Sequence, residues 1–302
     1  MAPTSRIYLT RHAQAEHVRV RLTQNVEDDY SIHDAPLTEL GKRQASRLPA
    51  LTPELQETVE VILSSPLRRT LQTVSLGYSD ALKRLGGPGQ VVCLPELQEC
   101  NDVPCDTGSD RAVLERLPEF ASFNLSKLTP EWNSKQGFFA ADDASLDARA
   151  KWIRQHLRER PEEHIVLVAH GDILRRVIKE EYPWTNAEVR LFQFVPDQVG
   201  HDECPLFHVK DIAAGGQTDA ELEADAGQDV YPVNSAPTLP TAAGKGKSRA
   251  GDASGAHPAL ASMEERVKQI QASVESQANE LEDLDRRLAE AEAKKAALEK
   301  QA

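Results

Sequence analysis

The amino-acid sequence predicts an α/β fold with a mostly parallel sheet. Short apolar runs bounded by polar residues, at 6–10, 59–63 and 164–168, are typical of buried strands. The segment after the third run, residues 172–181, has the pattern of a helix. Another helix is expected after the second run, with Pro66 in its first turn, where proline is favoured.

Further elements are expected in the same domain. Residues 145–158 predict a helix, and residues 190–195 predict the last strand of the sheet. Residues 101–110 contain Pro, Gly and Asp in a pattern typical of a loop. The predicted domain therefore combines buried strands with helices and one long irregular connection.

The amino-acid composition of the sequence changes at about residue 213. Residues 213–259 are rich in Gly, Ala, Pro, Thr, Asp and Glu and hold few large apolar side chains, so they predict a disordered linker. Residues 260–300 carry apolar side chains at alternating spacings of three and four, from Leu260 to Leu298, which is the heptad pattern of a coiled coil. We expect a domain over residues 1–212, the linker, and a coiled coil that pairs with a second copy or with a helical partner protein. A lone helix packed on the domain is the alternative.

The composition excludes several classes of protein. A net charge of −13 argues against binding to nucleic acid or to an anionic membrane surface. No apolar stretch is long enough for a signal peptide or a membrane span, so a cytoplasmic location is expected. The cysteines lack the paired spacing of a metal site and are expected to be free thiols in a reducing compartment: Cys93, Cys100, Cys105 and Cys204.

Five positions supply the side chains that phosphoryl transfer needs. A phosphate monoester carries about two negative charges, and the planar fork of arginine matches two phosphate oxygens, which makes Arg11 and Arg69 candidate phosphate ligands. One neutral imidazole can attack phosphorus while a second donates to the transferring group, the roles expected for His12 and His170. The leaving alkoxide needs a proton, and Glu99 is the candidate acid.

These candidates lie where strands are expected to end. Arg11-His12 follows the first expected strand, and His170-Gly171 follows the third. Open α/β sheets build their sites beyond the carboxyl ends of the strands. The free N–H groups at the start of the helix after Gly171 are expected to face an anion. The polar and aromatic residues of segment 184–190 either close one side of this site or fix the last strand.

The chain resembles the histidine phosphatase superfamily in its phosphoglycerate mutase-like branch. The resemblance covers residues 5–210 and rests on five segments in the family's order: Arg11-His12-Ala13, 36–45, 65–73 (Ser-Pro-Leu-Arg-Arg-Thr-Leu-Gln-Thr), Leu97-Gln98-Glu99 and His170-Gly171. It implies a three-layer sandwich and a phosphatase that hydrolyses a phosphate monoester through a phosphohistidine, with no cofactor and no metal. The resemblance implies catalytic roles for His12, Glu99 and His170. It implies phosphate binding by Arg11, Arg69, His170 and Gly171, and it selects Arg69 rather than Arg68 as the arginine of the pocket.

One position departs from the family pattern. Family members usually carry an asparagine that helps to hold the phosphate where this sequence has Val18, and valine cannot donate a hydrogen bond. His17 and Gln14 are the candidate replacements, and a lost charge-assisted bond costs about 1.5–3 kcal/mol. The expected substrate is a small phosphorylated molecule or a phosphoprotein. Two alternatives to a phosphatase stay open: a catalytically weakened phosphatase-fold scaffold that acts through its coiled coil, and a phosphoglycerate mutase-type phosphotransferase.

Overall fold

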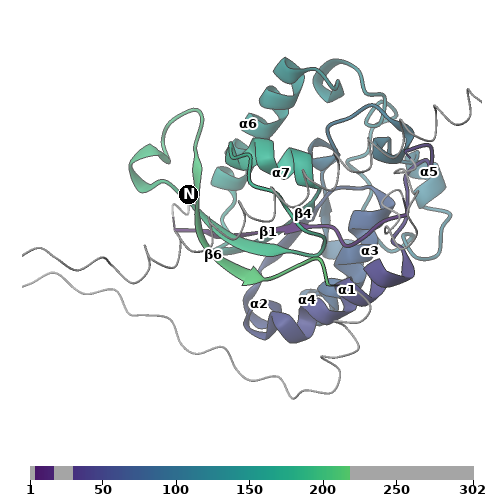
Figure 1. Ribbon diagram of the computed structural model, residues 1–302, viewed down its shortest axis with the longest axis horizontal. Coiled ribbons are helices and arrows are strands. Elements are labelled where there is room, and N and C mark those ends of the chain that lie inside the picture. Colours follow the sequence, from purple (N-terminus) through teal and green to yellow (C-terminus); the bar gives the residue numbers. More distant parts are fainter. Residues whose placement is uncertain (1–3, 17–29, 218–302) are drawn as a thin grey trace, which may run out of the picture. The chain divides into compact units, whose positions relative to one another are not determined.

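The computed structural model of this chain describes residues 4–16 and 30–217. These residues form an α/β fold around a six-stranded sheet (Figure 1). The predicted coiled coil at 260–300 lies outside the described residues, and so does the predicted linker from residue 218 onward. Within the described ranges, no helix is long and apolar enough to cross a membrane.

The sheet is mixed and mostly parallel, as predicted. Its strands lie in the order β3-β2-β4-β1-β5-β6. The first four are parallel to one another, while β5 runs antiparallel to β1 and β6 antiparallel to β5. The strands are β1 (Arg6–Arg11), β2 (Val61–Ser64), β3 (Val92–Cys93), β4 (His164–Ala169), β5 (Val189–Phe194) and β6 (Leu206–Ala213).

The prediction that the strand at 190–195 is the last one is wrong, because β6 follows it. β6 pairs with β5 only and forms an edge of the sheet. Its central residues 207–211 are exposed, so the strand lacks the run of apolar residues that marks buried strands in the sequence.

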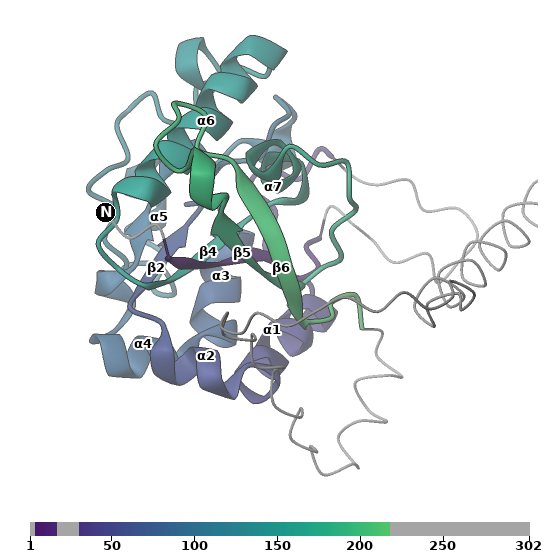
Figure 2. The same cartoon turned by 90° about the vertical axis from the view of Figure 1, so that its left-hand side faces the viewer.

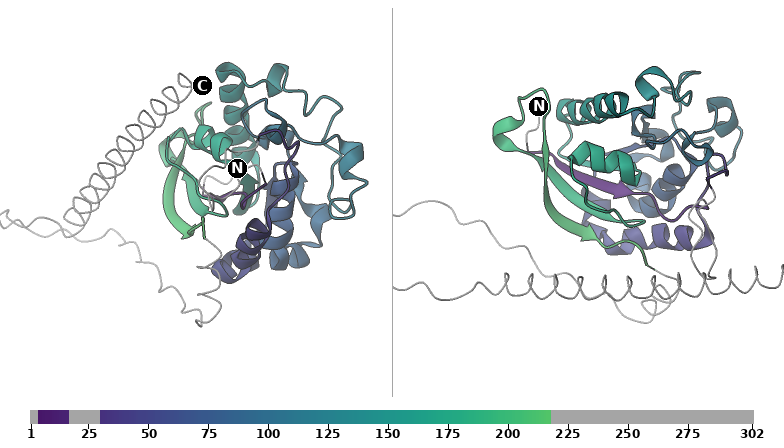
Figure 3. Two further views of the ribbon diagram at one scale, coloured as in Figure 1. Left: turned by 45° about the vertical axis from the view of Figure 1, so that its right-hand side comes forward. Right: turned by 45° about the horizontal axis from the view of Figure 1, so that its top comes forward.

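Helices cover both faces of the sheet, which gives the three layers that the family resemblance implied (Figure 2). Side chains alternate along each strand, so Tyr8 packs in one core while Ile7 and Leu9 pack in the other. A single turn, α5 (Arg111–Leu114), lies in the long connection from β3 to α6. The first layer contains α1 (Glu39–Leu51), α2 (Pro53–Thr58), α3 (Arg68–Gly77) and α4 (Ser79–Leu85), and the second contains α6 (Asp143–Glu159) and α7 (Gly171–Ile178) (Figure 3).

Helix α1 packs tightly against the segment that follows β1. Thr38 caps the helix, because its hydroxyl accepts a hydrogen bond from the N–H of Gly41 at 2.9 Å. A Cβ on Gly41 would lie 1.9 Å from the carbonyl oxygen of Gln14, so only glycine permits this approach. The contact fixes the chain immediately after the candidate nucleophile.

Helix α3 begins later than the sequence predicts. Pro66 was expected in the first turn, but the N-cap is Leu67 and the helix starts at Arg68. The Arg68 N–H donates to a carboxylate oxygen of Asp34 at 2.9 Å, so an acid from a distant loop supplies the cap. Arg69 still lies on this helix, in its first turn.

Candidate active site

The candidate residues follow the carboxyl ends of three neighbouring parallel strands. The N–H groups of His12 and Ser65 donate to carbonyl oxygens of β4, each at 2.9 Å, so both residues extend the sheet's hydrogen bonding by one position beyond β1 and β2. His170 directly follows β4. All three side chains therefore start at one edge of the sheet, where open α/β folds build their sites.

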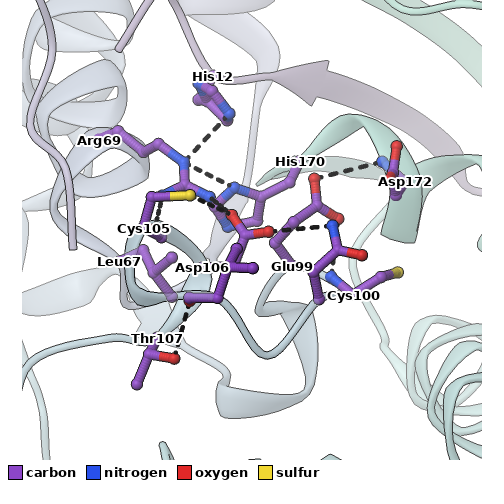
Figure 4. A network of polar contacts seen from close by, with 12 residues as sticks. His12, Leu67, Arg69, Glu99, Cys100, Cys105, Asp106, Thr107, His170 and Asp172 are labelled. Carbon is purple, nitrogen blue, oxygen red and sulfur yellow. Dashed lines mark hydrogen bonds and ion pairs between the residues drawn. The ribbon is translucent and has the colours of Figure 1, made fainter. Parts of the chain in front are cut away.

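Arg69 joins the two histidines. Its Nε donates to His12 Nε2 at 3.2 Å and to His170 Nδ1 at 3.1 Å (Figure 4). The two imidazole centroids lie 5.1 Å apart, and all three side chains are buried. A phosphate oxygen that accepts from this guanidinium is therefore within reach of both rings.

The contacts of His12 assign its ring protons. Nδ1 lies 2.7 Å from the carbonyl oxygen of Ala13, and a carbonyl only accepts, so Nδ1 carries the proton. Nε2 therefore presents a lone pair, which accepts from Arg69. This is the form of imidazole that attacks phosphorus. Asn186 Nδ2 and the Ala187 N–H both donate to the His12 carbonyl at 3.2 Å and anchor the residue.

Ser65 orients the second histidine. Because His170 Nδ1 accepts from Arg69, Nε2 of the neutral ring carries the proton and donates to Ser65 Oγ at 2.8 Å. Uptake of a second proton at Nδ1 would turn this nitrogen into a donor toward a bound phosphate. Ser65 opens the family-like segment at 65–73, but the sequence assigned it no role.

Asp106 fixes the far end of Arg69. The Arg69 Nη2 pairs with Asp106 Oδ1 at 2.9 Å, with side-chain exposures of 1% and 7%, and Nη1 donates to the Cys105 carbonyl. Asn101 Nδ2 donates to the other Asp106 oxygen at 3.2 Å. Sequence reasoning missed Asp106, because no local pattern marks a loop aspartate as the partner of an arginine on another element.

Arg11 lies beside the start of α7. Its Nη1 donates to the Trp184 carbonyl, and its Nε is buried with no hydrogen-bond partner among the described residues. Gly171 lies beside it, since a Cβ there would be 3.4 Å from this Nε, an ordinary van der Waals distance. Burial lowers the pKa of Arg11 from its usual value, while the charge of Glu99 opposes that shift. A guanidinium stays cationic at neutral pH, so the unpartnered N–H suits an anion.

Glu99 caps helix α7. Its Oε1 accepts from the N–H groups of Cys100 at 2.9 Å and Ile173 at 3.1 Å, and its Oε2 accepts from the Asp172 N–H at 3.4 Å. The N–H groups at the start of this helix were expected to face a substrate anion. For Asp172 and Ile173 this expectation is wrong, because their N–H groups donate to Glu99. Burial, and next the charges of Asp172 and Asp106, raise the pKa of the Glu99 carboxyl group from its usual value.

Of the two candidates proposed to replace the family's asparagine, the structure describes Gln14, which makes its contacts with α1 and the cap of that helix. The Gln14 side-chain oxygen accepts a hydrogen bond from the Thr38 hydroxyl at 2.8 Å. The backbone N–H of Gln14 donates to Gln44 Oε1 at 3.0 Å, so Gln14 is held against α1 and its cap. His17 and Val18 lie outside the described residues.

Segment 184–190 contacts the backbone of His12 and also packs at the start of β5. Asn186 holds the His12 backbone on the site side. The Arg190 guanidinium lies 4.1 Å from the centroid of the Trp184 ring, and its Nε donates to Glu188 at 2.6 Å. This packing fixes the beginning of β5 and the loop whose Trp184 carbonyl accepts from Arg11.

The four cysteines are free, as predicted, and the structure also shows that they are buried. Burial raises the pKa of the Cys105 thiol to about 12 and also raises the pKa of Cys100, so both are thiols at neutral pH. Within residues 4–16 and 30–217, no group of three or more His, Cys, Asp or Glu side chains is arranged to hold a metal ion.

The chain belongs to the histidine phosphatase superfamily (branch 1), to which residues 7–199 match. It is 27% identical over 179 residues to a probable phosphatase of Schizosaccharomyces pombe. The aligned region covers 59% of this chain and 79% of the yeast protein. It is 28% identical over 198 residues to phosphoglycerate mutase-like protein 1 of Arabidopsis thaliana, covering 56% of this chain and 68% of the plant protein. The family that the sequence motifs resemble is thus confirmed.

Solved structures also show likenesses, which concern the fold alone. Mycobacterial hydrolase 2 aligns with a TM-score of 0.44 and 19% identity over 74% of this chain and 96% of that protein. A phosphoserine phosphatase of Entamoeba histolytica, solved in complex with phosphoserine, aligns with a TM-score of 0.42 and 17% identity over 69% of this chain and 97% of that protein.

Proposed function

We propose that this protein is a phosphatase that hydrolyses a phosphate monoester through a phosphohistidine on His12. The observation that carries the proposal is the convergence of His12 Nε2 and His170 Nδ1 on the Nε of Arg69, near the buried carboxyl group of Glu99. A nucleophilic nitrogen, cationic donors and a proton donor are the groups that phosphoryl transfer requires. The similarity to the probable phosphatase of Schizosaccharomyces pombe supports the same class of reaction.

In the first step, the lone pair on His12 Nε2 attacks phosphorus in line with the ester oxygen. The N–P bond forms as the P–O ester bond breaks, and the leaving oxygen takes the proton of Glu99. The raised pKa of Glu99 keeps that carboxyl group protonated to a higher pH than usual. Arg11 and Arg69 stabilise the negative charge on the other phosphate oxygens.

In the second step, water attacks the phosphorus of the phosphohistidine. The Glu99 carboxylate accepts a proton from that water, the N–P bond breaks, and inorganic phosphate leaves. The Ala13 carbonyl keeps the proton on Nδ1, so Nε2 regains its lone pair. Transfer to an alcohol in place of water would give a mutase-type phosphotransferase, which shares the first step.

The test uses the purified full-length chain and p-nitrophenyl phosphate. We expect His12→Ala to abolish turnover and to abolish the covalent phosphoenzyme trapped by rapid denaturation with labelled substrate. His208→Ala is the matched control, because His208 is exposed on the edge strand β6. Turnover that survives in His12→Ala would refute the proposed nucleophile, and a folded wild-type chain that hydrolyses no phosphate ester would favour a scaffold.

The remaining expectations about substrate and assembly also stand as proposals. The substrate is a small phosphorylated molecule or a phosphoprotein, and the coiled coil at 260–300 pairs with a second copy or with a helical partner. The phosphoserine bound to the Entamoeba phosphatase is an example of a small substrate of this type. A cytoplasmic location fits the four free, buried cysteines.

A further inference from the structure

Two cationic side chains meet at the backbone of Glu99. Lys135 Nζ donates to the Glu99 carbonyl oxygen at 3.0 Å, and Arg149 Nη2 donates to the same oxygen at 3.4 Å. Lys135 lies in the loop before α6, and Arg149 lies on α6. Because like charges that share one acceptor repel each other, this arrangement is unfavourable unless an anion balances it.

Neither cation has a carboxylate partner within the described part of the chain. Arg149 is 0% exposed, and its Nε and Nη1 have no hydrogen-bond partner among these residues. Burial, and next the charge of Arg149, lower the pKa of Lys135 to about 8. Burial also lowers the pKa of Arg149. A buried cation without a direct ion pair is costly, so the pair favours an anion that binds beside it.

Lys135 is the member of the pair that a ligand can reach. Its side chain is only partly buried, whereas Arg149 is fully enclosed. Its backbone φ is +53°, a left-handed conformation that residues with a Cβ rarely adopt. Such strained residues persist where the surrounding structure requires their position.

The pair lies next to the proposed acid, because both side chains donate to the Glu99 carbonyl oxygen. The carboxylate charges of Asp106 and Glu99 oppose the effect of burial on the pKa of Lys135. A pocket of about 490 Å³ lies along α7, and its wall includes Cys100 and Asn101, the two residues that follow Glu99. Because Glu99 protonates the leaving oxygen, this is the side of the site where the alcohol part of a substrate lies.

The cations that line this pocket are already paired with carboxylates, whereas Lys135, which lies outside the pocket's lining, has no such pair among the described residues. Each lining cation forms an ion pair with a carboxylate, in the pairs Arg175–Asp172, Arg176–Asp147 and Lys179–Glu203. An anionic group on the alcohol part of a substrate is therefore attracted to Lys135 and Arg149 rather than to α7.

We propose that Lys135, backed by the buried charge of Arg149, is an anion subsite for the alcohol part of the substrate. The preferred substrate is then a phosphate monoester whose alcohol carries a second anionic group, a carboxylate or a second phosphate, close to the ester oxygen. This inference rests on the proposed function for its chemistry, but the binding of such a ligand can be measured without turnover.

A purely structural role for Lys135 makes a different prediction. If the ammonium group only holds the Glu99 carbonyl, Lys135→Gln should behave like wild type, because the glutamine amide still donates a hydrogen bond. If the charge binds substrate, Lys135→Gln loses the second anion while Lys135→Arg retains it. Lys83→Met is the control, because Lys83 is 77% exposed on α4.

The test is calorimetric titration of the full-length chain carrying His12→Ala, which prevents turnover. The first ligand pair is O-phosphoserine and O-phosphoethanolamine, which differ only in the carboxylate. The second pair is propane-1,3-diol bisphosphate and propyl phosphate, which differ in the second phosphate. We expect the anionic member of at least one pair to bind at least about tenfold more tightly, the effect of one charge-assisted hydrogen bond. The pair that discriminates identifies the carboxylate or the phosphate as the second anion.

Lys135→Gln should bring the two members of that pair to similar affinities, whereas Lys135→Arg and Lys83→Met should preserve the difference. Equal affinities in both pairs, a preference that survives Lys135→Gln, or no measurable binding of any ligand would overturn the subsite. Turnover of p-nitrophenyl phosphate by the wild-type chain reports the proposed function separately, because that substrate carries no second anion.

Discussion

Removing the carboxylate of Asp106 should destabilise the protein far more than removing an ion-pair partner at the surface. In Asp106→Ala, the Arg69 guanidinium stays buried between the two histidines without its counter-ion. The pair has an Nη2–Oδ1 distance of 2.9 Å and side-chain exposures of 1% and 7%, so solvent cannot replace the lost carboxylate. Removing one member of a buried ion pair costs about 3–5 kcal/mol, and we expect a loss of this size in the free energy of unfolding.

The control variant is Asp80→Ala, which removes one member of an exposed ion pair with the same N–O distance as the buried pair. Asp80 pairs with Lys83 at 2.9 Å, with side-chain exposures of 58% and 77%. Exposed pairs contribute less than about 1 kcal/mol, so Asp80→Ala should change the free energy of unfolding by no more than that. Both variants remove an aspartate at an N–O distance of 2.9 Å, and the two pairs differ in burial and in the cation, which is an arginine in one and a lysine in the other.

The assay is equilibrium urea unfolding followed by tryptophan fluorescence. All three tryptophans lie in the described domain, and Trp132 packs against Gly108, in the same loop as Asp106. Activity provides a second measurement: an Arg69 displaced by about 1 Å should cost roughly a hundredfold in kcat/KM. A loss of stability in Asp106→Ala no larger than in Asp80→Ala would refute the view that Asp106 compensates the buried charge.

Five further outcomes can be tested. Glu99→Gln should lower kcat/KM for alkyl phosphates by about 10²-fold or more and for aryl phosphates much less, and equal losses would show that Glu99 is not the acid. Because the pKa of Glu99 is raised, the wild-type rate with alkyl phosphates should fall only as pH rises above the usual carboxyl range. Ser65→Ala should lower kcat about tenfold and cost about 1–3 kcal/mol in the free energy of unfolding, because the buried His170 loses the partner that selects its tautomer. Affinity for a ligand with a second anion should weaken as pH rises through about 8, where Lys135 loses its charge, while phosphoethanolamine shows no such change. A chain that ends near residue 250 should be monomeric by light scattering and keep its phosphatase activity, whereas a monomeric intact chain would favour a helical partner over self-pairing.

The parts of the site that the sequence predicts are those that follow strand ends. Arg11, His12 and His170 come directly after apolar runs, and parallel strands bring their carboxyl ends to one edge of the sheet. Local pattern and sheet geometry are therefore enough to bring these residues together. The same reasoning yields a mostly parallel sheet, but not the direction of β5 or the existence of β6, which depends on pairing with another strand rather than on its own apolar pattern.

The contacts that the sequence does not predict are made by residues in loops, which contact residues of distant helices or strands. Asp106 and Lys135 lie in the long connection between β3 and α6, where neither strand nor helix periodicity fixes the direction of a side chain. Asp34 caps α3 from a separate loop in the same way. These positions are set by the burial of charge and by unpaired N–H groups, which only the folded chain reveals.

Glu99 has a contact pattern that suits both steps of the proposed reaction. Its burial disfavours the carboxylate and so favours the protonated acid that the first step needs. The same carboxyl group accepts N–H bonds from Cys100 and from the first turn of α7, and these bonds stabilise the carboxylate once the proton has left. The base that the second step needs is therefore held in place without movement of the side chain. A Glu99→Asp variant should separate the two contributions, because the shorter side chain cannot reach both the helix start and the leaving oxygen. We expect it to retain the pH dependence of an acid catalyst while losing most of its rate, and a variant with the full wild-type rate would show that capping α7 is not part of the mechanism.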